Sequence, residues 1–469
     1  MTIEKLFFEL LQVAIGNRKG LSHIPSAGEW RELFALSKKQ ALVGIAFAGV
    51  TRLIRSTSSG TEAGDYGASL GMDEMTYLKW LGMLAKIQQR NKTVSQDCVR
   101  LAKDLAHDGM SCCVLKGQSN LVYYPEDLRE CRTPGDIDVL IRPADEAGIE
   151  IAVADLDGKG AHYERYAGIR GSIEYVRMQC RLHDVPVGKI CYHHLDMPTD
   201  FETSVEAHHR ATWLNSPIRN WRLQRWLEEN MPFGVCDADF THWCSFDSAQ
   251  DRRPPLCKKR GDSSIKRSDP AIDKNVEILD GFTNHRATFP IPTVSFNAVY
   301  QLLHIYKHLF EEGIGLRQLL DYYFVLRTLH IEQGTLADRT ESMAQWAEGM
   351  GIAVASNEEI MHTLSRFGMK KFASAVMYVL QTVFAMPDVY LLCPPNEKEG
   401  KFLLDEIMQA GNFGKYDDRI KHGGTQSQHA WEKTKHNLRL LTHYPEEVLC
   451  EPFFRIYHWI WRRFELWRY

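Results

Sequence analysis

The spacing of apolar residues predicts helices over residues 1–108. In Trp30–Leu36, and again from Tyr77 towards Leu105, apolar residues recur three or four positions apart. This spacing gathers them on one face of a helix, which can then pack against a core. Ser56–Gly71, between the two stretches, is rich in Ser and Gly and predicts a loop. We therefore expect an N-terminal helical region.

The pattern changes at Met110, where short apolar runs replace the helical spacing. Ser111–Leu115 and Ile137–Ile141 have the length of buried strands and end at turn-forming residues. Residues 109–234 are thus predicted to form a mixed α/β core. Within it we also expect one or two helical turns in Gln118–Tyr124, a helix in Ala144–Leu156, and strands in Ile173–Arg181, Lys189–Leu195 and Thr203–His208.

Residues 235–275 interrupt the apolar pattern. Pro254-Pro255 precedes the polar and basic run Cys257–Ser264, and such runs predict a flexible, solvated insertion. From Ser295 onward the helical spacing returns, which predicts a helical region over 276–390 that packs on the core and a C-terminal helical tail over 391–469. The helices expected there include Leu316–Leu326, Met343–Met350, Asn357–Phe367, Lys371–Phe384 and Gly400–Ala410.

The fold class predicted from these patterns is α+β, with a small mixed-sheet core flanked by helical regions. The chain has 469 residues and a net charge of -4, which argues mildly against a large nucleic-acid footprint. Met1–Lys5 lacks the basic-then-apolar order of a secretory signal, and Ala41–Val50 is too short to cross a bilayer. Its 11 Cys form no regular framework, so we expect a cytoplasmic protein with reduced thiols.

The residues with the clearest chemistry are Asp136 and Asp138. Side chains alternate along a strand, so carboxylates at positions i and i+2 project to the same face. Hard oxygen ligands of this kind suit Mg²⁺ or Mn²⁺, which promote phosphoryl and nucleotidyl transfer. A pair of acids at a strand end is also common as a solvated edge or a cap.

The segment upstream of this pair suits a phosphate group. Gly117 follows a predicted strand and allows the backbone to approach a phosphate closely, while Ser119 offers a hydroxyl near a helix start. Lys116 and Arg132 are candidates for neutralising phosphate charge. The sequence therefore predicts a triphosphate-binding turn beside a metal-binding carboxylate pair.

Taken together, these motifs resemble an uncharacterised branch of the DNA polymerase β-like nucleotidyltransferase superfamily. The resemblance rests on Leu115-Lys116-Gly117, Tyr124-Pro125, Arg132 and Gly135–Ile141. Val205–His208 stands in the place of the branch's Val-Glu-x-His strand, and His308–Phe310 with Gly313–Asp321 is similar to its helical region.

This resemblance implies a small twisted sheet flanked by helices and transfer of a nucleoside monophosphate from a nucleoside triphosphate (NTP). It implies that Asp136, Asp138 and Glu206 bind the metal ions, and that Gly117 and Ser119 form the phosphate turn. The usual turn has adjacent Gly and Ser, whereas Gln118 separates them here. Asp196, Asp200 and Glu202 are alternatives to Glu206, which we prefer because it lies inside the predicted strand. The acceptor, whether a small molecule, a protein or RNA, stays open.

Two helical pairs admit both a structural and a functional interpretation. Arg317 and Asp321, four positions apart, form either a simple helical ion pair or part of a helix that lines the nucleotide cleft. His304 and His308 have a spacing that can hold a metal, but without a third ligand they are more typical of satisfied core groups. The loose cluster of Cys236, His242, Cys244 and Cys257 matches no compact zinc pattern.

The tail allows functions of other classes. A helix packed on the body, an interfacial helix on a membrane and a platform for stacking on bases all fit its composition. The alternatives to an enzyme are a catalytically inactive nucleotide-binding or scaffold protein, and a membrane-associated partner protein that uses this tail. The aromatic residues of the tail are Phe453, Phe454, Tyr457, Trp459, Trp461, Phe464, Trp467 and Tyr469, interleaved with Arg455, Arg462, Arg463 and Arg468.

Overall fold

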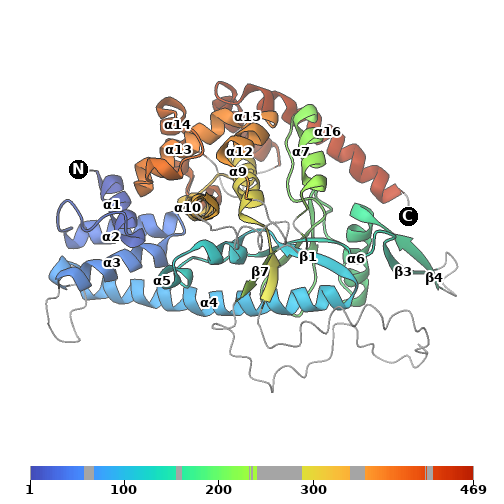
Figure 1. Cartoon of the computed structure of the whole chain (residues 1–469), viewed down its shortest axis with the longest axis horizontal. Helices are drawn as coiled ribbons and strands as arrows, with labels where there is room; N and C mark the ends of the chain where they lie inside the picture. Colours follow the sequence, from blue (N-terminus) through green and yellow to red (C-terminus); the bar gives the residue numbers. More distant parts are fainter. Residues whose placement is uncertain are drawn as a thin grey trace, which may run out of the picture.

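A computed structural model describes residues 2–57, 68–154, 161–231, 233, 236–239, 288–337, 354–417, 419 and 426–467. It confirms the predicted α+β class, with a small mixed sheet between two sets of helices (Figure 1). Most of the expected insertion over 235–275 and the expected helix Met343–Met350 lie outside the described residues. Within the described part of the chain, no helix has the length and apolar character needed to span a membrane.

The N-terminal helices form where the apolar spacing predicts them. Their starts are capped by side chains: Thr2, Ser26 and Asp73 each accept a hydrogen bond from a backbone N–H of the following turn. Trp80 is fully buried, and its indole N–H donates to the Val43 carbonyl, which ties the longest helix to its neighbour. These helices are α1 (Ile3–Ile15), α2 (Ala27–Lys39), α3 (Val43–Thr57), the single turn η1 (Ala68–Leu70) and α4 (Glu74–His107).

The central sheet has four strands in the order β1-β2-β6-β5. Strand β2 pairs antiparallel with β1 and parallel with β6, while β5 pairs antiparallel with β6. The buried residues of β2 and β6 pack against α4 and α6, forming a second core beside that of the helices. The strands are β1 (Met110–Val114), β2 (Ile137–Pro143), β5 (His194–Met197) and β6 (Val205–His208), and the covering helix is α6 (Gly168–Leu182).

Two predicted elements in this core are wrong. Ile173–Arg181, expected as a strand, lies in helix α6, because Ile173, Val176 and Cys180 are buried at helical spacing. Ala144–Leu156, expected as a helix, contains strand β3 (Ile149–Ala154), which pairs with β4 (Ala161–Tyr166). In β3 the apolar residues alternate with period two, and that pattern outweighs the helix-forming residues around it.

Short elements connect the strands that carry the site. Helix η2 (Gly117–Tyr123) and α5 (Glu126–Arg129) join β1 to β2, and Pro125 separates them as the sequence predicts. Helix α7 (Pro217–Glu229) follows β6, and β7 (Cys236–Asp239) pairs with β8 (Thr288–Ile291).

The C-terminal half is helical and covers the open side of the sheet (Figure 1). Helix α9 is almost entirely buried, and its contacts with α10 form the centre of the larger core. The elements are α9 (Val294–Glu311), α10 (Leu316–Ala337), α12 (Asn357–Arg366), α13 (Lys370–Phe384), η4 (Asp388–Tyr390), α14 (Glu397–Ala410), η5 (Asn412–Gly414), α15 (Gln426–Leu441) and α16 (Pro445–Trp467).

Helix α16 packs on the body through aromatic rings. Phe454 stacks on Trp213 with 6.0 Å between ring centroids, and Trp461 stacks on His209 at the same separation. Other side chains of this helix, such as Phe453 and Phe464, are largely exposed. Packing on the body therefore accounts for part of the aromatic tail, and the exposed side chains leave the other two interpretations untested.

Gly44 gives a test of how α3 positions the loop before β2. A Cβ at this position would lie 2.3 Å from the Cys131 carbonyl oxygen, which is backbone and cannot rotate away. We predict that Gly44→Ala lowers the free energy of unfolding by about 1–3 kcal/mol through overpacking. Gly82→Ala on α4, where nothing lies within 4 Å of the added Cβ, should instead raise it by roughly 0.5–1 kcal/mol. Urea denaturation of the two variants compares them, and equal effects would contradict the close approach.

Candidate active site

The three predicted acids lie on one face of the sheet because of strand alternation and register. Asp136 immediately precedes β2 and is two residues from Asp138, so both project to the same side. Strand β6 runs parallel to β2 with Glu206 directly opposite Asp138. The structure therefore brings Glu206 beside the carboxylate pair from a strand that begins 68 residues after β2 (Val205 against Ile137).

The basic side chains of Lys116 and His208 both contact the buried carboxylate of Asp138. The Leu115 N–H donates to the Asp138 carbonyl at 2.8 Å, which places Lys116 next to that residue. The Lys116 ammonium lies 2.8 Å from Asp138 Oδ2, and His208 Nε2 lies 3.1 Å from Oδ1. His208 Nε2 is also 3.6 Å from Glu206 Oε2, so this buried imidazole bridges both carboxylates.

The electrostatic balance differs between the acids. Burial raises the pKa of Asp136, and the neighbouring charges of Asp138 and Glu206 raise it further. Burial acts in the same direction on Asp138, but Lys116 and His208 outweigh it and hold the pKa of Asp138 far below its usual value. Burial also acts to raise the pKa of Glu206, but the hydrogen bond and charge of His208, together with the charge of His194, outweigh it and lower that pKa. The site thus favours the ionised forms of Asp138 and Glu206, whereas the charges of Lys116 and Arg317 only partly offset the causes that raise the pKa of Asp136.

This donor set fits a hard divalent cation. One oxygen from each of Asp138 and Glu206 and one nitrogen of His208 lie within 4.8 Å of one another. Asp136 adds a third carboxylate to the lining of the same cavity, where a cation would relieve the repulsion that contributes to its raised pKa. Of the alternative acids, Asp200 lies 3.9 Å from Arg100, Glu202 is exposed, and Asp196 groups with His194 and Glu206.

The predicted phosphate turn has the backbone that glycine favours. Gly117 has a φ of 73°, in the left-handed region, and begins helix η2 directly after β1. Lys116 and Gly117 both line the cavity above the acids. Ser119, separated from Gly117 by Gln118, is fully buried and is not part of this lining.

Arg132 and Asp321 form a buried ion pair that ties the loop before β2 to α10. Arg132 Nε and Nη2 each donate to a carboxylate oxygen of Asp321 at 2.7 Å, and the Tyr124 hydroxyl donates to the same group at 2.6 Å. The main ion pair of Asp321 is thus with Arg132. The helical ion pair between Arg317 and Asp321, one of the two expected roles, is not the main interaction of Asp321. Arg317 instead donates to the Thr133 carbonyl at 3.0 Å and lines the cavity.

One cavity of about 1330 Å³ is lined by Lys116, Gly117, the acids Asp136, Asp138 and Glu206, His208 and Arg317. The lining also includes the helix α16 residues Phe454, His458, Trp459 and Arg462. Since ligand pockets usually have volumes of about 300–1,000 Å³, this cavity has room for a nucleotide and a second molecule.

Several cavity residues had no predicted role. His193 directly precedes β5, His194 is its first residue, and Lys307 lies on α9. The sequence shows the adjacent histidines, but only the pairing of His194 with His208 across β5 and β6 brings them to the site. His304 and His308 also line the cavity, with 3.0 Å between their Nε2 atoms.

The Arg132–Asp321 pair predicts a large loss of stability when it is broken. We expect Asp321→Ala to lower the free energy of unfolding by about 3–5 kcal/mol, because it leaves a buried guanidinium without a counter-charge. Glu229→Ala, which breaks the exposed pair with Arg225, should cost less than about 1 kcal/mol. Chemical denaturation measures both, and a loss for Asp321→Ala as small as that of the control would contradict the account.

Comparison with known proteins agrees with the resemblance predicted from the motifs. Residues 26–248 match a family described as uncharacterised nucleotidyltransferase, a range that contains Lys116, Gly117 and all three acids. No match was found among curated proteins or among solved structures. Residues 26–248 of the chain are therefore similar to the family described as uncharacterised nucleotidyltransferase.

Proposed function

We propose that this protein is a metal-dependent nucleotidyltransferase that moves a nucleoside monophosphate from an NTP to an acceptor hydroxyl. The proposal is supported by the presence of Asp136, Asp138 and Glu206 in the lining of one cavity large enough for both substrates. The acceptor oxygen attacks the α-phosphorus, the bond to the bridging oxygen breaks, and pyrophosphate leaves. We assign this reaction to the cytoplasm.

The acids and the glycine turn have separate tasks. Mg²⁺ or Mn²⁺ held by Asp136, Asp138 and Glu206 would stabilise the charge that develops on the phosphate oxygens. Lys116, now paired with Asp138, is close enough to turn its ammonium towards the triphosphate, and the backbone at Gly117 can approach a phosphate oxygen without a side chain in the way. Glu206 is positioned to accept the proton of the acceptor hydroxyl. Arg132, held by Asp321, acts by positioning the loop that carries Asp136.

The crowding of charge favours an enzyme over a scaffold protein. Three carboxylates on one sheet face raise the pKa of Asp136 and cost free energy unless a cation is present. A protein that only held other proteins together would gain stability if one of these three carboxylates were replaced by a neutral side chain. We place the acceptor beside Trp459 and Arg462 of α16, which line the same cavity.

The three acids give a direct test. We predict that Asp136→Asn, Asp138→Asn and Glu206→Gln each reduce transfer by at least about a hundredfold, since one lost electrostatic contact to a transition state costs roughly 10²–10³ in rate. Transfer is measured as incorporation of label from α-labelled NTPs, with Mg²⁺, into an extract of the source cells. Chelation by EDTA should have the same effect, and added Mg²⁺ or Mn²⁺ should restore activity.

Matched controls lie on the same segments. Glu202→Gln, four residues before Glu206 and exposed, and Asp145→Asn, in the exposed loop after β2, should keep transfer within about twofold of the unmodified protein. Wild-type transfer by any of the three site variants, or an equal loss in Glu202→Gln, would refute the proposed site.

A further inference from the structure

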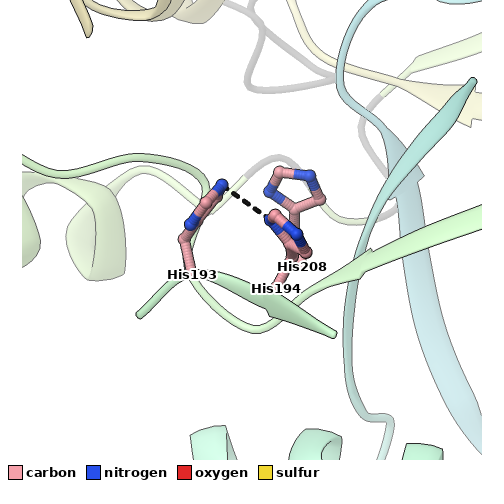
Figure 2. A group of neighbouring side chains, drawn as sticks. All are labelled: His193, His194 and His208. Carbon is pink, nitrogen blue, oxygen red and sulfur yellow. Dashed lines mark hydrogen bonds between the residues drawn. The ribbon is translucent and has the colours of Figure 1, made fainter. Parts of the chain in front are cut away.

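Three histidines gather beside the carboxylates, on the side of β5. His193 directly precedes β5, His194 is its first residue, and His208 is the last residue of β6. The antiparallel register places His194 opposite His208. Figure 2 shows the three rings side by side, with His193 and His194 joined by a hydrogen bond. The cluster is therefore fixed by the pairing of two strands of the sheet.

The nitrogens of this cluster are close enough to share one ion. One nitrogen from each of His193, His194 and His208 lies within 4.8 Å of the other two. The Glu206 carboxylate completes the group, with Oε2 lying 3.6 Å from His194 Nδ1 and 3.6 Å from His208 Nε2. Ligands bound tetrahedrally at about 2.0–2.1 Å lie roughly 3.3 Å apart. The two 3.6 Å separations are near that value, and the 2.7 Å between His193 Nε2 and His194 Nδ1 needs only a small opening.

The histidine cluster already lies next to a positively charged side chain, that of Lys307. The Lys307 ammonium lies 2.8 Å from His193 Nε2, and it is also 3.7 Å from Glu311, one turn further along α9. Lys307 therefore stands beside the nitrogen that a metal would use. A shift of its side chain towards Glu311 would free His193, so Lys307 is a built-in competitor for this position.

Three imidazoles and one carboxylate are the ligands of a different metal from Mg²⁺. Imidazole suits Zn²⁺ and its neighbours in the first transition row, whereas Mg²⁺ selects oxygen ligands and water. We propose that His193, His194, His208 and Glu206 form a binding site for a transition-metal ion of the Zn²⁺ class, next to the oxygen-rich site at Asp136 and Asp138. This site goes beyond the proposed transferase activity. It shares Glu206 with the proposed Mg²⁺ site, and its ligand His208 also contacts Asp138 of that site.

The test uses Co²⁺, whose visible absorption reports four-coordinate binding to imidazole. The full chain, freed of metal and of any histidine tag, is titrated with CoCl₂ and then with ZnCl₂ or MgCl₂. We expect visible bands that saturate at one Co²⁺ per chain, that Zn²⁺ removes, and that excess Mg²⁺ leaves in place. His194→Gln should lose the bands, while His308→Gln, a histidine on the same cavity but outside the cluster, should keep them.

Lys307→Met makes the test independent of any folding defect in the histidine variants. Because it removes the competing ammonium, it should lower the Kd for Co²⁺ by on the order of tenfold. Asp136→Asn should keep the bands although we expect it to lose transferase activity, so the two proposals fail separately. Absence of saturable bands, bands that survive in His194→Gln, or weaker binding by Lys307→Met would overturn the proposed metal site.

Discussion

The repulsion among Asp136, Asp138 and Glu206 is the constraint on which the rest of this structure depends. Adjacent parallel strands place Asp138 and Glu206 opposite each other, and strand alternation adds Asp136 to the same face. Lys116 and His208 contribute enough positive charge to keep Asp138 ionised, but burial and the other two acids still raise the pKa of Asp136. A folded protein that keeps this arrangement is well suited to bind cations where a triphosphate can meet them.

The helices around the sheet maintain this arrangement by fixing the loop before β2. Asp321 of α10 holds Arg132 with two hydrogen bonds, and Asn91 of α4 donates to the Arg132 carbonyl at 2.6 Å. Gly44 of α3 lies against the neighbouring backbone at Cys131. Two neighbouring N-terminal helices and one helix of the C-terminal half thus converge just ahead of Asp136. Both the N-terminal and the C-terminal helical regions thereby contribute to the geometry of the site.

Much of the candidate site could be predicted from short sequence patterns, because the geometry behind each pattern involves only neighbouring residues. The period of two in Asp136-x-Asp138, the turn at Gly117 and the stop at Pro125 are each features of a few adjacent residues. The structure of Ile173–Arg181 was mispredicted because a short apolar run fits a strand or a buried helix, and only packing against β2 decides between them. The histidine cluster and the wall formed by α16 depend on strand register and on the docking of distant helices. Neither of these is encoded in local spacing.

The most direct test of the central claim is anomalous X-ray diffraction from crystals of the protein with Mn²⁺ and a non-hydrolysable NTP analogue. The account predicts an anomalous peak bounded by the carboxylates of Asp136, Asp138 and Glu206, with the triphosphate extending towards Lys116 and Gly117. A peak bound to other residues, or a triphosphate placed away from these acids, would contradict it.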